Sequence, residues 1–231
     1  MTVSLCLIVW NELGGLKHDL PLIDRSQFDE IFCIDGGSTD GSVDFLKENG
    51  ITVYQQSAKG LNQACKDAVS HCTCDAFVFY HPKGTIPVED TYKFRKYFED
   101  EYELVVGSRM MKDSVNEEDS HLFKPRKWFV LTLGLLAKIL FKRDDGITIW
   151  DTLHGFRGMT VKAFESLSIS NMNPSIDIEM VCRSYKLKLK RIEFPTKERQ
   201  RLEGSTHFKA FATGKKLIKY LIWEISRKDN V

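Results

Sequence analysis

Residues 30–41 read EIFCIDGGSTDG, and this stretch decides how the first half of the chain folds. It begins with a short apolar run that is typical of a β-strand, continues through a turn of small and polar residues, and leads into a helical pattern. A strand that passes through a tight turn into a helix begins a βαβ unit. The carboxyl ends of the strands in an open parallel sheet line the ligand crevice. The stretch therefore predicts an α/β domain with a binding site beside Asp35.

Asp35 closes this strand, and its carboxylate has two interpretations. An acid fixed at a strand end accepts a hydrogen bond from the imide or amide N–H of a pyrimidine or guanine base. In the alternative, the stretch is an ordinary βα turn in which Ser38, Thr39 or Asp40 caps the next helix. The local chemistry favours the turn, so the rest of the chain has to decide between the two.

Similar apolar runs and helical segments alternate along the chain. Strands are predicted at residues 3–9, 30–34, 51–54, 76–80, 104–106, 147–150 and 191–195. Helices are predicted at residues 40–49, 61–70, 88–97, 162–167 and 176–184, with an apolar segment at 128–141 and a polar loop at 111–120. This alternation predicts a mainly parallel central sheet flanked by helices.

The length of 231 residues allows one good hydrophobic core. We expect one domain over residues 1–206 and a basic amphipathic helix over residues 207–231, where lysines interrupt an apolar stripe. Within the domain, residues 126–142 are apolar on nearly all sides but fall short of the roughly 20 residues that cross a bilayer. The two segments either lie on an anionic membrane surface or pack against the domain.

The charge balance and the cysteines limit the class of protein. Lys and Arg (33) nearly cancel Asp and Glu (32), so no overall positive field gathers nucleic acid. The six cysteines are scattered, several of them in apolar runs, as is usual in a reducing compartment. The N-terminus enters a strand-like run without the features of a signal peptide. We therefore expect a cytoplasmic protein with no nucleic-acid partner.

An ordered series of short motifs runs along the chain. They are VWNE at 9–12, DGGSTDG at 35–41, KGLN at 59–62, VGSR at 106–109, DTLHGFR at 151–157, DIE at 177–179 and RLEGST at 201–206. In this order they resemble the family 2 glycosyltransferases, and the later motifs are most similar to the polyprenyl-phosphate branch, such as dolichol-phosphate mannose synthases. The resemblance implies the GT-A fold, the nucleotide-diphospho-sugar transferase fold, and transfer of a sugar with inversion.

The resemblance also implies roles for particular residues. Those that it assigns to the nucleotide sugar are Trp10, Glu12, Asp35, Lys59, His81 and Lys83. Asp151 and Glu179 are candidates for a general base or for orienting the acceptor. A phosphate acceptor is ionised at neutral pH and needs no base, so a structural role is the alternative for both acids.

Transfer from a nucleoside diphosphate leaves a diphosphate, whose negative charge the site has to neutralise. Arginine binds phosphate in a bidentate manner, so we expect the phosphates of donor or acceptor at Arg109, Arg157 and Arg201. The alternative for each is an arginine in a surface ion pair.

The chain departs from the family after the strand at 76–80. There the family carries D-x-D, whose carboxylates hold Mg²⁺ or Mn²⁺, whereas this chain reads His81, Pro82 and Lys83. Two hard oxygen ligands are missing, so we expect no metal ligands at these positions. Our hypothesis is that Lys83 substitutes for the charge of the metal in catalysis. The alternative is a degenerate site that binds nucleotide sugar weakly or not at all.

These motifs predict an enzyme that transfers a sugar from a UDP- or GDP-sugar, with polyprenyl phosphate at the cytoplasmic face of a membrane as its acceptor. The alternative is a catalytically silent module that binds nucleotide sugar or a partner enzyme. A sugar nucleotidyltransferase is set aside because residues 11–16 lack the G-x-G-x-R loop that it needs. Base, sugar and acceptor depend on pocket shape, which the motifs do not specify.

Overall fold

The computed structural model describes the whole chain except residues 117, 120–122, 201–209 and 228–231. Within the described residues there is one sheet of seven strands in the order β3-β2-β1-β4-β6-β5-β7. The strands are β1 (Val3–Val9), β2 (Glu30–Asp35), β3 (Thr52–Gln55), β4 (Ala76–Tyr80), β5 (Leu104–Ser108), β6 (Arg157–Thr160) and β7 (Arg191–Pro195). Only β6 runs antiparallel to its neighbours in this sheet, so the predicted mainly parallel α/β fold is confirmed.

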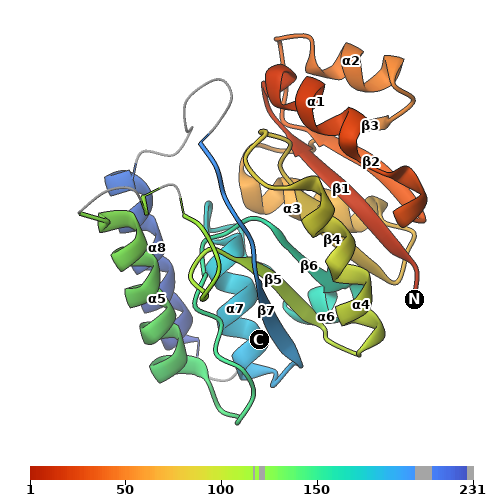
Figure 1. Ribbon diagram of the computed structural model, residues 1–231. Coiled ribbons are helices and arrows are strands. Elements are labelled where there is room, and N and C mark those ends of the chain that lie inside the picture. Colours follow the sequence, from red (N-terminus) through yellow and green to blue (C-terminus); the bar gives the residue numbers. More distant parts are fainter. Residues whose placement is uncertain (117, 120–122, 201–209, 228–231) are drawn as a thin grey trace.

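Helices cover both faces of the sheet (Figure 1). They are α1 (Leu13–Asp19), α2 (Ser42–Glu48), α3 (Leu61–His71), α4 (Lys93–Glu99), α5 (Pro125–Phe141), α6 (Val161–Ser166), α7 (Ile176–Lys186) and α8 (Ala210–Ser226). Short 3₁₀ turns lie at η1 (Leu20–Leu22), η2 (Arg25–Gln27) and η3 (Val88–Tyr92). Of the described helices, none is both long and apolar enough to cross a membrane.

Each face of the sheet carries its own apolar core. Alternate residues of β1 point to opposite faces, as the period of a strand requires. Cys6 and Ile8 pack in the core that α3, α5, α6, α7 and α8 cover. Leu5 and Leu7 pack in the core that α1, α2 and α4 cover. Every residue of β1 is buried, which explains why this strand reads as a continuous apolar run rather than an alternating one.

The sequence placed most elements correctly. The strands at 3–9, 76–80 and 191–195 have the predicted bounds, and the strands at 30–34 and 104–106 are confirmed with longer carboxyl ends. The helix predicted at 88–97 divides into η3 and α4.

The predicted strand at 147–150 is wrong. These residues form no strand, because their backbone N–H groups bond to side chains: that of Ile149 donates to the Tyr185 hydroxyl at 2.8 Å, and that of Trp150 to the Glu193 carboxylate at 2.9 Å. The strand in this region is β6, whose sequence RGMT is not an apolar run. A glycine is needed there because a Cβ at Gly158 would lie 2.6 Å from the Phe77 carbonyl oxygen.

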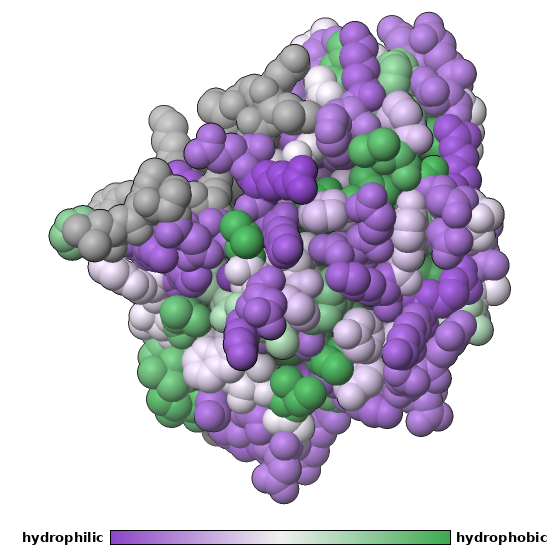
Figure 2. All heavy atoms as spheres, in the orientation of Figure 1, coloured by the Kyte–Doolittle hydropathy of each residue, from purple (hydrophilic) through white to green (hydrophobic). Residues whose placement is uncertain are grey.

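The helices α5 and α8 lie side by side on one flank of the molecule (Figure 1). Each buries one face in the core: α5 through Leu133 and Ala137, and α8 through Tyr220 and Leu221. Their outward faces expose large apolar side chains, of which those on α5 gather at the lower left of Figure 2. Both helices therefore pack on the domain and also present apolar surface to the outside.

Candidate active site

The sheet topology brings most of the predicted site residues that the structure describes to one edge. The strands β1, β2, β4, β5 and β7 are parallel to one another and end at this edge, whereas the antiparallel β6 begins there. The segments that follow the five parallel strands therefore meet the segment 151–156 that precedes β6. Motifs that are up to about 140 residues apart in sequence become neighbours because parallel strands share their carboxyl edge.

The turn after β2 is organised around Asp35, whose side chain is 1% exposed. Its carboxylate accepts hydrogen bonds from the backbone N–H groups of Gly37 at 2.9 Å and Ser38 at 3.1 Å. The turn is also bonded to the segment after β1, since the Asn11 N–H donates to the Ser38 hydroxyl at 2.8 Å and Thr39 donates to the Asn11 side chain at 2.8 Å. The carboxylate thus holds its own turn in shape, and binding of a base by Asp35 stays a prediction.

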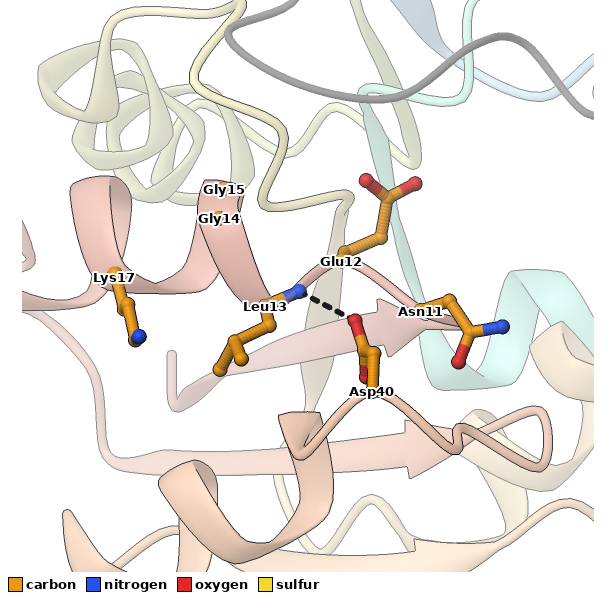
Figure 3. Close-up of a pocket in the computed structure, with 7 residues that line it drawn as sticks. All are labelled: Asn11, Glu12, Leu13, Gly14, Gly15, Lys17 and Asp40. Atoms are coloured by element: carbon orange, nitrogen blue, oxygen red, sulfur yellow. Dashed lines mark hydrogen bonds between the residues drawn. The ribbon is translucent and has the colours of Figure 1, made fainter.

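A cavity of about 320 Å³ opens beside this turn (Figure 3). It is lined by Asn11, Glu12, Leu13, Gly14, Gly15, Lys17 and Asp40. The Asp40 carboxylate accepts the Leu13 N–H at 3.0 Å, and the Glu12 carboxylate extends in a different direction (Figure 3). Two acids from separate strand ends therefore lie at one polar opening.

Two further residues of the predicted nucleotide-sugar set lie at the surface. The Trp10 side chain is 48% exposed, and it packs beside Gly36, where a Cβ would lie 3.2 Å from the Trp10 Cβ. Lys59 is exposed in the turn before α3. Trp10 thus offers an aromatic face next to the Asp35 turn, which is a suitable surface for stacking a base.

The turn that replaces D-x-D is held firmly by α1. The Asp19 carboxylate accepts hydrogen bonds from the Gly84 N–H at 2.9 Å and the Tyr80 hydroxyl at 3.0 Å. Close packing adds to this, because a Cβ at Gly15 would lie 2.7 Å from the Lys83 Cα. Any side chain at position 15 would displace the turn, so its backbone position depends on that glycine.

His81 and Lys83 are near the loop before β6 and the start of α7, respectively. A Cβ at Gly155 would lie 2.8 Å from the His81 Nε2, so the imidazole rests against the loop before β6. Burial raises the pKa of Asp177 at the start of α7, and the Lys83 charge opposes this shift together with charges from nearby arginines. Lys83 is therefore close enough to α7 to act electrostatically on Asp177.

The residues at the D-x-D positions do not fit a Mg²⁺ or Mn²⁺ ion. Among the described residues, no group of three or more His, Cys, Asp or Glu side chains is arranged to hold a metal. At the D-x-D turn itself, one imidazole and one ammonium replace two carboxylates. A hard cation prefers oxygen ligands, and a lysine ammonium offers no lone pair.

Arg109 and Asp151 form a buried ion pair with several hydrogen bonds at this edge. The Asp151 oxygens accept from Arg109 Nε at 2.8 Å and Nη2 at 2.9 Å, and also from the Arg109 backbone N–H at 2.9 Å. Glu198 accepts from Arg109 Nη1 at 2.9 Å. Burial by itself raises the pKa of Asp151, but the charge of Arg109 outweighs it and holds that pKa well below its usual range. Such an acid is a weak base, and its bonds fix the orientation of the Arg109 guanidinium.

The Arg157 guanidinium donates hydrogen bonds to backbone carbonyl groups. The side chain is fully buried, with Nε donating to the His154 carbonyl at 2.7 Å and Nη1 to the Asp177 carbonyl at 2.5 Å. Its Nε also lies 3.3 Å from the Asp177 carboxylate. Arg157 thereby fastens the loop 151–156 to the start of α7.

The two acids of the DIE motif have different surroundings. Glu179 is fully buried, accepts hydrogen bonds from Ser170 and Ser175, and pairs with Arg183 at 2.8 Å. The Asp177 side chain is 18% exposed at the edge of the site. Residues two apart on a helix differ by about 200° in direction, so only one of the two can face the crevice. Asp177 was not among the predicted site residues, but the helical period could have identified it as the acid that faces the crevice.

His154 is a second residue that sequence reasoning did not select. Its side chain is 6% exposed, its Nδ1 is bonded to the Gly107 carbonyl, and the same nitrogen lies 3.9 Å from Asp151. Burial, with the charge of Arg109 adding to it, lowers its pKa to about 4. His154 is therefore neutral at pH 7. The remaining predicted site residue, Arg201, lies outside the described residues.

Comparisons with known proteins bear on this site. The model of the family "Glycosyl transferase family 2" matches residues 4–168. The glycosyltransferase AglJ of Haloferax volcanii is 26% identical over 209 residues, which are 87% of this chain and 65% of that protein, so the chain spans slightly less than two thirds of this relative.

Solved structures share the fold at low sequence identity. Glucosyl-3-phosphoglycerate synthase of Mycobacterium tuberculosis, in complex with Mn²⁺, UDP-glucose and phosphoglyceric acid, superposes with a TM-score of 0.69 at 15% identity over 97% of this chain and 80% of that one. Its complex with Mn²⁺, UDP and glucosyl-3-phosphoglycerate gives a TM-score of 0.68 at 14% identity, with the same coverage. The GT-A fold expected from the sequence is thereby confirmed.

Proposed function

Because the chain belongs to glycosyl transferase family 2, we propose that it transfers a sugar, with inversion, from a UDP- or GDP-sugar to an acceptor. The proposal rests on one observation. The turns that contain Asp35 and Lys83 and the segment that contains Arg109 all follow parallel strands, so they meet at the carboxyl edge of a single sheet. Acids accept base N–H groups, and cations neutralise the diphosphate that leaves. The edge therefore combines the two chemistries that a nucleotide-sugar donor requires.

The nucleoside end of the donor belongs to the β1 and β2 side. Asp35 and Glu12 supply buried carboxylates there, and Trp10 supplies an exposed indole face. Lys59, in the turn before α3, offers a cation to the same ligand. The nucleotides in complex with the structural neighbours are UDP and UDP-glucose, which supports a uridine donor as the first to test.

The diphosphate of the donor binds on the side of the site where Lys83 and Arg109 lie. Lys83 stands where the family holds a divalent cation, and its ammonium supplies positive charge to the leaving diphosphate without any metal. Arg109 contributes its positive charge directly after the carboxyl end of β5, where its side chain is 14% exposed. Arg201 completes this set in our proposal. His81, packed on Gly155, lines the crevice between the two sides.

In this proposal the buried charged residues keep other parts of the site in position. Asp151 orients Arg109 and does not remove a proton, because its lowered pKa makes it a weak base. Arg157 and Glu179 are fully enclosed, so we assign them to the frame that fixes the loop 151–156 and α7. A phosphate acceptor is already ionised at neutral pH and needs no general base, which is consistent with this role of Asp151.

The acceptor side of the proposal rests on the paired helices α5 and α8. Their exposed apolar side chains are Trp128, Leu135, Ile139, Ile218, Ile222 and Ile225. Lysines of α8 lie along the same helix, among them Lys216 and Lys219. Apolar side chains beside lysines suit the surface of an anionic bilayer. On its buried face, Gly134 of α5 packs against Trp150, so this helix contacts the residue next to Asp151. We therefore propose polyprenyl phosphate at the cytoplasmic membrane face as acceptor.

One experiment tests donor, acceptor and metal together. The purified chain is incubated with UDP- or GDP-sugars and polyprenyl phosphate in vesicles that contain anionic lipid, with EDTA or with Mn²⁺, and nucleoside diphosphate release is measured. We expect release that depends on the lipid phosphate and is equal under both conditions. Activity that EDTA abolishes and Mn²⁺ restores would overturn the role of Lys83. If the chain does not pellet with anionic vesicles at low salt, the proposed binding of α5 and α8 to a membrane is wrong.

The missing acid pair favours one second candidate, a silent module that binds nucleotide sugar. Thermal-shift measurements with the same donors separate it from the enzyme, because a ligand that binds the folded state raises the melting temperature. A donor that raises the melting temperature without any nucleotide release under all conditions identifies the silent module.

A further inference from the structure

A buried acid on β7 has no part in the function proposed above. Glu193 is 6% exposed and lies two residues before the end of its strand. Its Oε1 accepts hydrogen bonds from two consecutive backbone N–H groups, that of Trp150 at 2.9 Å and that of Asp151 at 2.7 Å. Buried N–H groups need partners, and no strand supplies them here. One carboxylate oxygen therefore fixes the peptide groups just before the DTLHGFR motif.

The second of these N–H groups belongs to the residue that holds Arg109. The Asp151 carboxylate takes three hydrogen bonds from Arg109, all between 2.8 and 2.9 Å. The backbone N–H groups of Trp150 and Asp151 both donate to one oxygen of Glu193, so a rotation of this backbone segment would break both hydrogen bonds. The direction of the Asp151 side chain, and with it that of the Arg109 guanidinium, depends on this anchor.

We propose that Glu193 is a positioning residue for sugar transfer: it fixes the Asp151 backbone so that Asp151 presents Arg109 to the phosphates of the substrate. This inference rests on the function proposed above. Glu193 acts through Asp151 and does not touch the substrate. A displacement of about 1 Å in a group that orients reactants costs up to about a hundredfold in rate, so an anchor of this kind has a measurable effect.

The surroundings of Glu193 also make its action depend on pH. The charged and titratable groups that face it are Asp151 from the loop before β6 and Tyr185 from α7, whose ring also contacts the Arg191 guanidinium, and the Ser108 hydroxyl faces it from β5. Burial raises the pKa of Glu193 to about 7, and the negative charge of Asp151 adds to this, against the two N–H donors. Protonation below pH 7 weakens the two bonds, because a neutral carboxyl is a poorer acceptor than a carboxylate.

The test compares two substitutions with the natural chain. Glu193→Ala removes both hydrogen bonds, whereas Glu193→Gln keeps an acceptor oxygen in place and removes the charge. The exposed Glu165 of α6 provides the matched control, as Glu165→Gln. For each variant, kcat/KM for nucleotide release is measured from pH 5.5 to 8.5. Binding of the nucleoside diphosphate and hydrogen exchange of the Trp150 and Asp151 amides are measured alongside.

We expect Glu193→Ala to lower kcat/KM by roughly ten- to a hundredfold, with faster exchange of the two amides and weaker binding of the nucleoside diphosphate, because Arg109 is no longer held toward its phosphates. We expect Glu193→Gln to stay within about threefold of the natural chain but to lose the inflection near pH 7. Folded Glu193→Ala with unchanged kcat/KM overturns the proposal. If that variant does not fold, an inflection that persists in Glu193→Gln overturns it. Absence of release by the natural chain overturns the proposed function and this inference with it.

Discussion

The two sides of the candidate site are built in different ways. On the β1 and β2 side, side chains such as Asp35 and Asn11 bond to backbone groups of one continuous turn, and Trp10 is half exposed. On the β5 to β7 side, Arg109 and Asp151 form a buried ion pair between segments 42 residues apart. The first side is therefore a local structure that a short sequence motif specifies, whereas the second is a tertiary assembly whose parts stabilise one another.

Breaking the ion pair on the β5 to β7 side should have the largest effect. Asp151→Asn leaves Arg109 largely buried without its main counter-charge, which costs about 3–5 kcal/mol of unfolding free energy. Denaturant titration measures this loss. The exposed Asp145 gives the control, since Asp145→Asn should change the free energy by less than about 0.5 kcal/mol. Equal stability of the two variants would show that the pair does not support the fold.

The lysine turn joins the two sides, and its loss should affect activity rather than stability. We expect Lys83→Ala to lower nucleotide release by at least about a hundredfold, because it removes charge that stabilises the departing diphosphate. The melting temperature should stay nearly unchanged, because Lys83 is only half-buried. The exposed Lys47 on α2 serves as control. Release by Lys83→Ala that matches Lys47→Ala contradicts the electrostatic role.

The buried imidazole makes the β5 to β7 side sensitive to acid. The pKa of His154 is lowered to about 4 in the folded chain, below the value of about 6.5 expected when unfolded. Its neutral form therefore contributes stability that is present above pH 6.5 and is lost as the pH falls toward 4, amounting to about 2 kcal/mol at pH 5. Glu193, whose pKa is raised to about 7, changes stability in the opposite direction over this range. Unfolding free energies are therefore measured at pH 7 and pH 5 for both the natural chain and His154→Gln, and the difference between the two chains gives this loss. His154→Gln should remove that part of the pH dependence, and an unchanged dependence speaks against it.

The smallest effect is expected on the β1 and β2 side. Trp10→Ala removes a half-exposed side chain, so stability should change little, while nucleotide affinity falls about tenfold if the base stacks on the indole. Calorimetric titration with UDP and with GDP measures this change. The exposed Leu22 provides a control away from the pocket, as Leu22→Ala. Affinity that is the same in both variants places the base elsewhere.

Sequence reasoning succeeded where burial follows from local pattern. The apolar runs of β1 and β4 predicted these strands with their observed bounds, because strands buried on both faces read as continuous apolar segments. It failed at β6, where packing against the Phe77 backbone requires glycine instead of an apolar side chain. It also failed at residues 147–150, whose backbone bonds to side chains of α7 and β7.

For the site residues, the sequence motifs predicted which segments lie at the carboxyl edge of the sheet. They did not predict how exposed each side chain is. Arg157 and Glu179 belong to motifs that resemble site elements, yet both are fully buried and bonded to the frame. Asp177 is more exposed than Glu179 because the period of α7 turns it toward the edge.

The α/β fold, the Asp35 turn and the exchange of the acid pair for His81 and Lys83 can all be read from residues that are neighbours in the chain. Which charged groups face the crevice and which hold it together becomes visible only in the folded molecule. Burial, and the pKa shifts of Asp151, His154 and Glu193 that follow from it, depend on side chains brought together from distant strands.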